Sequence, residues 1–369
     1  MTEYFRKTKG LGLFQLLDSR TKAELMDIVR VLEFPGYKGM MKGAIVDKLT
    51  TDLSVEFNTL LQHIDGQVYD YLYYLASHKG LALAENFPGI TGVNLMYLGM
   101  VFRVMIDDVR MFAMPYEFVE IFNSSDTDDF YKTVTKNQGV VQLAQGLLSR
   151  YGVLETEVLF GMINGYLKES IDEEELYMIL RISGVINELI EVDTFYCNHT
   201  LCEDIRSVIL GAMEFRELDY KRFTFKEILK YSIIDYYENT PELIRFKVFI
   251  HRHIEIDEET LDRRILYLLL LYADNISIDE IVEFLLGEFK ELPRNAFEEF
   301  SKIITDLNNT TGKWALKGYS SDEILELKKN KNLSDDAANR PKLTLIKGRN
   351  NKLCPCGSGK LHKDCCGRR

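Results

Sequence analysis

The sequence has no long apolar segment. A helix that spans a membrane needs about 18 or more consecutive apolar residues, whereas the longest run here, from Ile265 to Ala273, is interrupted by Tyr267 and Tyr272. The start of the chain also lacks the apolar core of a secretory signal peptide. These absences predict a cytoplasmic protein that does not insert into a membrane.

Short catalytic motifs are absent as well. The sequence contains no Gly-x-Ser-x-Gly elbow, no Gly-x-Gly-x-x-Gly fingerprint and no kinase signature. Gly359-Lys360 matches the end of a phosphate-binding loop, but Cys354 stands where that motif needs its first glycine. With no candidate nucleophile or base, the chain is predicted to be non-enzymatic.

Basic residues are outnumbered by acidic ones. Lys and Arg total 45 against 57 Asp and Glu, which gives a net charge of −12. This balance argues against tight nonspecific binding of nucleic acid by the whole surface, because such binding depends on basic groups that neutralise phosphates. The charge is uneven, however. Residues 340–369 hold nine bases and one acid, so this tail carries +8 and the rest of the chain −20.

Cysteine is rare except near the end of the chain. Four of the six cysteines fall within thirteen residues, namely Cys354, Cys356, Cys365 and Cys366. Cysteines this close together fit ordinary disulfide geometry poorly, whereas four thiolates are the number that a closed tetrahedral zinc site requires. We therefore predict that they bind one structural Zn²⁺, and that the metal supplies the folding energy that so short a segment lacks.

Residues 352–368, with Cys354-Pro-Cys-Gly-Ser-Gly-Lys360 and Cys365-Cys366-Gly367, resemble the SEC-C motif. This motif ends the bacterial protein-export motor ATPase and forms a tail on many otherwise unrelated bacterial proteins. The resemblance implies a zinc knuckle in which Cys366 is the fourth ligand, and a partner that is a protein or a ribosome-like ribonucleoprotein. His362 falls in the spacer and is interpreted as a surface residue. The nucleotide-binding motifs of the export motor are absent from this sequence.

A weaker group of metal-ligating residues lies in the middle of the chain. Cys197, His199 and Cys202 offer three donors, and His251 or His253 is a candidate fourth. The competing interpretation is that both cysteines are ordinary buried side chains near a strand, because cysteine is among the most buried residue types. Both interpretations stay open at this point.

The first 52 residues are predicted to form a helix–loop–helix module. Thr21-Lys-Ala-Glu24 is a capping box that starts a helix, the stretch Phe34–Gly39 breaks it, and apolar residues resume at helical spacing from Ile45. This pattern resembles the SAP and Rho-termination-factor N-terminal modules, which often bind nucleic acid. The resemblance implies phosphate contacts by Lys38 and Lys42. A small helical packing unit without such contacts is the alternative.

Two further units are predicted to resemble winged helices. Residues 53–140 contain helices followed by two apolar runs around Asp107-Asp108, which suits the tip of a β-hairpin. Residues 141–222 repeat this order, with a second hairpin over 188–196. The candidate recognition segment Tyr69–Ala76 has no arginine, although reading of the DNA major groove normally needs Arg, Asn or Gln. Winged helices also bind proteins, so DNA contact is not implied by the pattern alone.

The rest of the chain is predicted to be a helical bundle followed by a tail. Residues 223–327 have apolar residues three and four apart, with helix starts at Pro241, at Ser277-Ile-Asp-Glu280 and at Ser320-Ser-Asp-Glu323. Residues 328–351 are predicted to be a flexible basic linker, and residues 352–369 form the zinc motif. The expected fold class is mainly α: a multi-helical body with small winged-helix-like hairpins and a C-terminal zinc knuckle.

These predictions favour a non-enzymatic zinc-binding adaptor that uses its C-terminal knuckle to bind a protein or ribonucleoprotein partner. The first alternative is a nucleic-acid-associated regulator that binds DNA or RNA through the N-terminal module and the winged-helix-like units. The second alternative is a metal-dependent hydrolase with an unrecognised site, for which the Cys197 group is the only basis.

Overall fold

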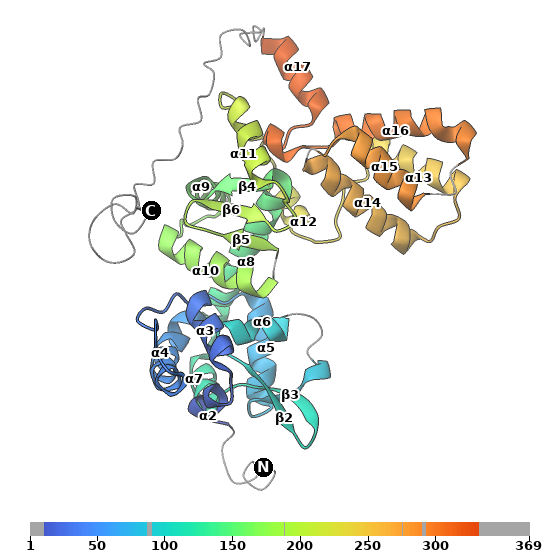
Figure 1. Ribbon diagram of the computed structural model, residues 1–369. Coiled ribbons are helices and arrows are strands. Elements are labelled where there is room, and N and C mark those ends of the chain that lie inside the picture. The colour runs from blue at the N-terminus through green and yellow to red at the C-terminus, as the bar shows by residue number, and fades with distance from the viewer. Residues whose placement is uncertain (1–10, 87–90, 188, 275, 290–292, 332–369) are drawn as a thin grey trace, which may run out of the picture. The chain divides into compact units, whose positions relative to one another are not determined.

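A computed structural model describes residues 11–86, 91–187, 189–274, 276–289 and 293–331 (Figure 1). The chain divides into two compact units, residues 1–324 and residues 325–369. The secondary structure is mainly helical with two small antiparallel sheets, which confirms the predicted mainly α class. Within the described ranges, no helix combines the length and the hydropathy that a membrane span requires.

The first part of the chain surrounds one hydrophobic core. Its elements are α2 (Leu13–Asp18), α3 (Lys22–Val31), α4 (Lys42–Gln62), α5 (Gly66–Ser77), β1 (Leu81–Leu83), η1 (Ala84–Asn86), α6 (Thr91–Tyr97), β2 (Phe102–Ile106), β3 (Val109–Ala113) and α7 (Tyr116–Ser125). The predicted capping box is confirmed, because the Thr21 hydroxyl accepts the Glu24 N–H and the Glu24 carboxylate accepts the Thr21 N–H. Helix α4 continues through residue 52, with Leu53 and Phe57 buried.

The first sheet has the order β1-β3-β2. Strands β2 and β3 form the predicted hairpin, with Ile106 opposite Val109. Asp107 and Asp108 have φ of 50° and 62°, as a two-residue type I′ turn requires at both positions. Aspartate tolerates this region better than most residues because its short polar side chain bonds locally. The acidic pair therefore marks a turn.

The second part of the chain has the same strand arrangement. Its elements are α8 (Asp128–Tyr151), β4 (Val153–Glu155), α9 (Thr156–Tyr166), α10 (Glu173–Asn187), β5 (Ile190–Val192), β6 (Tyr196–His199), α11 (Ile205–Glu214) and α12 (Phe225–Tyr231). The sheet order is β4-β6-β5, and Cys197 of β6 lies between Leu154 and Val192. The predicted second hairpin is thus confirmed. In both sheets the first strand pairs with the third.

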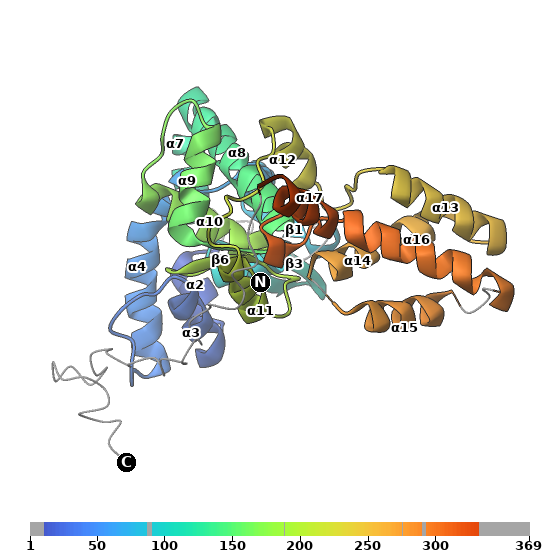
Figure 2. The same cartoon turned by 90° about the horizontal axis from the view of Figure 1, so that it is seen from above.

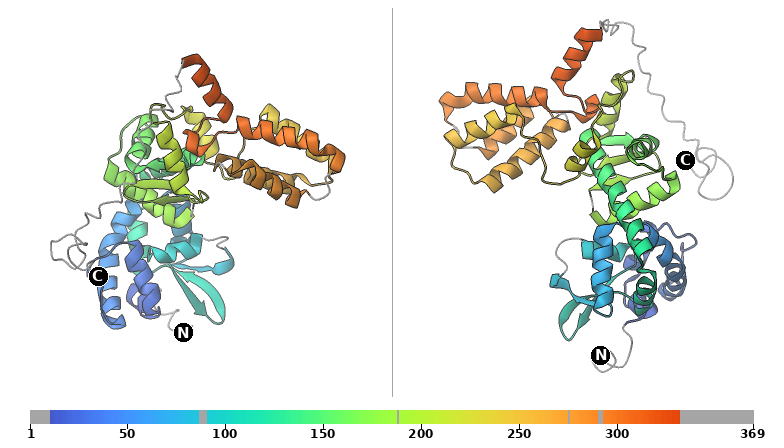
Figure 3. Two further views of the ribbon diagram at one scale, coloured as in Figure 1. Left: turned by 45° about the horizontal axis from the view of Figure 1, so that its top comes forward. Right: turned by 180° about the vertical axis from the view of Figure 1, so that it is seen from behind.

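The third part is a group of helices around a separate core (Figure 2). Its elements are α13 (Pro241–His253), α14 (Glu258–Ala273), α15 (Ile278–Glu288), η2 (Arg294–Ala296) and α16 (Phe297–Thr310). They are followed by η3 (Trp314–Leu316) and α17 (Ser321–Lys331). Thr240 caps the helix that begins at Pro241, and Ser277 forms a capping box with Glu280. These predicted helix starts are confirmed. The short helix η3 packs against α8 and α11 (Figure 3).

Candidate functional site

The four cysteines predicted to bind zinc lie outside the residues that the structure describes, as does His362. The chemistry of the four cysteine side chains still indicates which metal they suit. Four soft thiolates, without an oxygen donor, suit Zn²⁺ and disfavour the hard cations Mg²⁺ and Ca²⁺. Cys354, Cys356, Cys365 and Cys366 therefore fit a closed zinc site by type and number.

The two lysines predicted to contact nucleic acid differ in their surroundings. Lys42 is the first residue of α4, and its Nζ donates a 2.6 Å hydrogen bond to the Asp18 carbonyl oxygen. Lys38 is exposed in the loop between α3 and α4. The neighbouring Tyr37 anchors this loop, because its buried ring lies under Lys48 and its hydroxyl donates a 2.8 Å hydrogen bond to Asp52. Nucleic-acid contact by Lys38 and Lys42 stays a prediction.

The candidate recognition segment Tyr69–Ala76 lies within α5 and is largely used for packing. Leu72, Leu75 and Ala76 are buried. The Tyr69 hydroxyl donates a 2.9 Å hydrogen bond to Asp126, and burial raises the pKa of Tyr69 to about 12. The exposed side chains of this segment are Asp70 and Tyr73, and neither is an Arg, Asn or Gln of the kind that normally reads base edges.

Helix α10 precedes the β5–β6 hairpin, and it faces the first part of the chain. The Arg181 guanidinium donates to the Val31 carbonyl oxygen and lies 3.4 Å from the Glu33 carboxylate. Asn94 donates a 3.1 Å hydrogen bond to the Ile186 carbonyl oxygen. Ile182 and Ile186 belong to the core of the first part. Helix α10 is thus committed to contacts within the protein.

The middle cysteines are buried and lie in separate surroundings. The Cys197 thiol is 3.5 Å from the Thr156 hydroxyl, and the Cys202 thiol donates a weak 3.9 Å hydrogen bond to Asp274. Burial raises the pKa of Cys197, and it raises that of Cys202 to about 12. Both thiols are therefore protonated near neutral pH, as expected of ordinary buried cysteines. Burial also lowers the pKa of His199.

No group of three or more His, Cys, Asp or Glu side chains able to hold a metal occurs among the described residues. His251, predicted as a candidate fourth ligand, instead lies 3.1 Å from Glu258. His253 packs on the ring of Phe249. The described part of the chain therefore gives no support to a zinc site at Cys197, His199 and Cys202.

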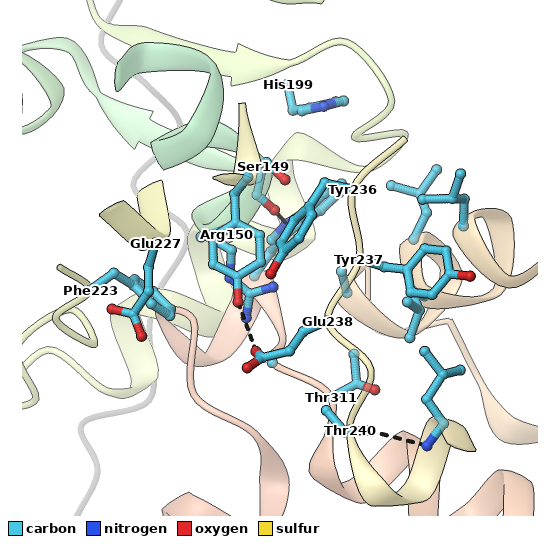
Figure 4. Close-up of a pocket in the computed structure, with 18 of the residues that line it drawn as sticks. Ser149, Arg150, His199, Phe223, Glu227, Tyr236, Tyr237, Glu238, Thr240 and Thr311 are labelled. Carbon is cyan, nitrogen blue, oxygen red and sulfur yellow. Dashed lines mark hydrogen bonds between the residues drawn. The ribbon is translucent and has the colours of Figure 1, made fainter. Parts of the chain in front are cut away.

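A cavity of about 540 Å³ opens beside the C-terminal end of α8 (Figure 4). Its walls come from α8, from α12 and the segment that follows it, from α14 and from the residues after α16. Tyrosines are frequent on this surface, and Arg150, Tyr231, Tyr236, Tyr237 and Trp314 are among the lining residues. We call it the Arg150 pocket. No local pattern in the sequence predicts this pocket, although the tyrosine-rich stretch 231–237 indicates an aromatic surface.

The comparisons with known proteins give a family-model match near the end of the chain and a partial match to one curated relative. The family model for the SEC-C motif matches residues 351–368. The protein translocase subunit SecA of Thermodesulfovibrio yellowstonii is 37% identical over 84 residues, which cover 22% of this chain and 10% of that protein. This chain thus spans about a tenth of the length of the curated relative that it matches. No solved structure matches the chain significantly.

Proposed function

We propose that this chain is a non-enzymatic zinc-binding adaptor. Its four C-terminal cysteines bind one Zn²⁺, and the resulting knuckle binds a protein or ribonucleoprotein partner. The observation that carries this proposal is the SEC-C match at residues 351–368, a segment that contains Cys354, Cys356, Cys365 and Cys366. The +8 charge of residues 340–369 adds support for a partner with an acidic or phosphate-bearing surface.

The proposed zinc is structural rather than catalytic. A hydrolytic zinc keeps an open position for water or substrate, whereas four thiolates close the coordination shell. Lys360 and Lys363 lie within the motif and partly offset the negative charge that four thiolates leave around a dication.

Metal stoichiometry tests the zinc site. The full-length protein, reduced and without a histidine tag, should contain about one zinc per chain, and the same chain ending at Gly348 should contain none. Cys202→Ala is the matched control, because it removes a thiol of the body and should leave zinc content unchanged. Zinc that survives the truncation would place the metal in the body and would refute the tail site.

Partner binding needs its own test. Purified ribosomes should carry the full-length chain down on sedimentation, or a specific protein should co-purify with it. Cys354→Ser combined with Cys365→Ser should abolish that binding while the body stays folded by circular dichroism. If zinc is lost and every interaction is retained, the adaptor role fails although the zinc assignment stands.

We also infer that the second predicted winged-helix-like unit, residues 141–222, is used for protein contact. Support comes from the order α8, β4, α9, α10, β5, β6 together with the sheet order β4-β6-β5. Because α10 is engaged with Val31 and Asn94, protein contact is favoured over DNA contact for this helix.

Nucleic-acid binding by the N-terminal module is the competing proposal. It requires salt-dependent binding of labelled DNA or RNA that the double change Lys38→Glu and Lys42→Glu weakens. The double change Lys226→Glu and Lys302→Glu, at exposed sites outside this module, is the charge-matched control. Binding that is absent or independent of salt would remove this alternative.

A further inference from the structure

The Arg150 pocket contains a cation that has no carboxylate partner in the part of the chain that the structure describes. The Arg150 guanidinium lies over two aromatic rings, 4.5 Å from the Tyr231 centroid and 5.1 Å from the Phe223 centroid. Its Nε is buried and has no hydrogen-bond partner among the described residues. Across the same ranges, no carboxylate forms an ion pair with it. A guanidinium has five N–H donors and no acceptor, so this arrangement leaves strong donors unused.

Three carboxylates line the pocket, and two of them are engaged elsewhere, while the exposed third, Asp235, forms no ion pair with Arg150 among the described residues. The Glu227 carboxylate accepts the N–H and the hydroxyl of Thr224 at the start of α12. The Glu238 carboxylate accepts a 3.2 Å hydrogen bond from the Tyr231 hydroxyl (Figure 4). Lys221 is already paired with Glu323 at 2.6 Å. Arg150 is therefore the lining cation that is both partly buried and without a carboxylate partner in the described chain.

Burying an unpaired charge is costly, and an oxyanion is the group that best satisfies a guanidinium, through two parallel N–H···O hydrogen bonds. The aromatic rings under Arg150 hold its plane in place, which reduces the side-chain entropy lost when an anion binds. The volume of about 540 Å³ suits a small molecule rather than a lone ion.

The remaining walls of the pocket indicate the chemistry of the part of the ligand that lies away from its anionic group. Tyr236, Tyr237 and Tyr267 present aromatic surface, and Leu266 and Leu270 add aliphatic surface. Flat rings stack well on such walls. We propose that the Arg150 pocket binds a small organic anion with a flat apolar body, held by its carboxylate or phosphate on Arg150. This site is independent of the zinc tail.

Trp314 makes the proposal measurable, because it is the only tryptophan of the chain and it lines the pocket. Phenyl phosphate and benzoate are the two probes, and they distinguish a phosphate from a carboxylate. Binding is followed by calorimetry and by Trp314 emission. At least one probe should bind saturably and change the emission, whereas neutral benzamide should not bind at the same concentration.

Variants locate the anion. Arg150→Gln should weaken binding of the anionic probe by about tenfold or more. Arg216→Gln is the matched control, because Arg216 is exposed and does not line the pocket, and its binding should equal that of the wild type. If Arg150→Gln does not fold, Arg150→Lys replaces it, since lysine keeps the charge and removes the forked donors, and about a threefold loss is then expected.

Two results would overturn the proposal. One is that neither anionic probe binds below about 10 mM, an affinity weaker than any specific site would show. The other is that binding is unchanged by Arg150→Gln in a folded protein. Because the tail is not involved, a chain ending at Gly348 should give the same result as the full-length protein.

Discussion

The indole N–H of Trp314 donates a 3.0 Å hydrogen bond to the carbonyl oxygen of Ser149, a residue 165 positions earlier in the sequence. Trp314 is almost fully buried. Its ring lies against Gly152, where an added Cβ would come within 2.5 Å of the indole. Gly152 also has a φ of 69°, a backbone conformation that glycine adopts without steric cost. One tryptophan thus fastens the loop after α16 to the end of α8.

Gly152→Ala should destabilise the body by about 2 kcal/mol or more, because it combines a strained positive φ with a clash against a rigid buried ring. Gly139→Ala is the matched control within the same helix. Its Cβ would meet nothing within 4 Å, so it should be neutral or stabilise the helix by about 0.5–1 kcal/mol. Urea unfolding curves measure both, and equal effects of the two changes would contradict the importance of the Trp314 contact.

Asp65 should make stability fall as the pH rises. It is almost fully buried at the N-cap of α5, and burial raises the pKa of its carboxyl above the usual value. The folded protein therefore holds this proton more tightly than the unfolded chain, whose carboxyl has a pKa of 3.8. The protonated carboxyl stabilises the fold at low pH, and this stabilisation is lost as the pH rises above 3.8 and through the folded pKa. Asp65→Asn should flatten this dependence.

Asp257 gives the opposite control for this experiment. It caps α14 at an exposed site, and the Thr260 N–H lowers the pKa of its carboxyl. Its contribution is present at neutral pH and is lost as the pH falls through the folded pKa. Asp257→Asn should therefore remove this loss, so that stability falls less steeply on the acid side of the profile. Urea midpoints measured across the pH range distinguish the two cases, and identical profiles for both variants would refute the assignment.

Zinc content should depend on Cys366 and not on His362. Cys366→Ala removes one of four thiolates and should lower zinc affinity strongly, whereas His362→Ala should leave one zinc bound, because His362 is interpreted as a surface residue of the spacer. Competition with a chromophoric zinc chelator measures both variants. If His362→Ala lost zinc and Cys366→Ala did not, His362 would be the fourth ligand in place of Cys366.

Features that depend on a few neighbouring residues could be predicted from the sequence. Thr21 and Glu24 satisfy each other's backbone N–H groups whatever the rest of the chain does, and Asp107 tolerates a positive φ at a hairpin tip. The tail is a local pattern of the same kind, but its four cysteines lie outside the described residues, so their role as a ligand set stays a prediction. Helix α4 runs past the predicted module boundary at residue 52, because nothing in the local pattern marks residue 62 as the end of the helix.

The Arg150 pocket could not be predicted, because its residues come from positions 149 to 314. No periodicity connects Arg150 with Tyr231, and only the packing of α8 beside α12 brings them together. The same holds for α10, whose apolar stripe predicts a buried face but does not say that Val31 and Asn94 cover it. Contacts between distant segments leave no trace in the local pattern of one sequence.

Arg181→Ala should destabilise the body by about 1–3 kcal/mol, because it removes the donor to the Val31 carbonyl oxygen and the pairing with Glu33. The Arg181 side chain is only 19% exposed. Arg30→Ala is the control, because that side chain is 76% exposed and pairs only at the surface with Asp27, so its effect should stay within about 0.5 kcal/mol.

Arg181→Ala also distinguishes packing within the protein from DNA reading as the role of α10. If α10 serves protein packing, Arg181→Ala lowers the urea midpoint and leaves any binding of DNA unchanged when compared at equal folded fraction. If α10 instead reads DNA, Arg181→Ala leaves the midpoint unchanged and weakens DNA binding, since an arginine free to meet bases would hold no structural hydrogen bond. The Val31 contact predicts the first result.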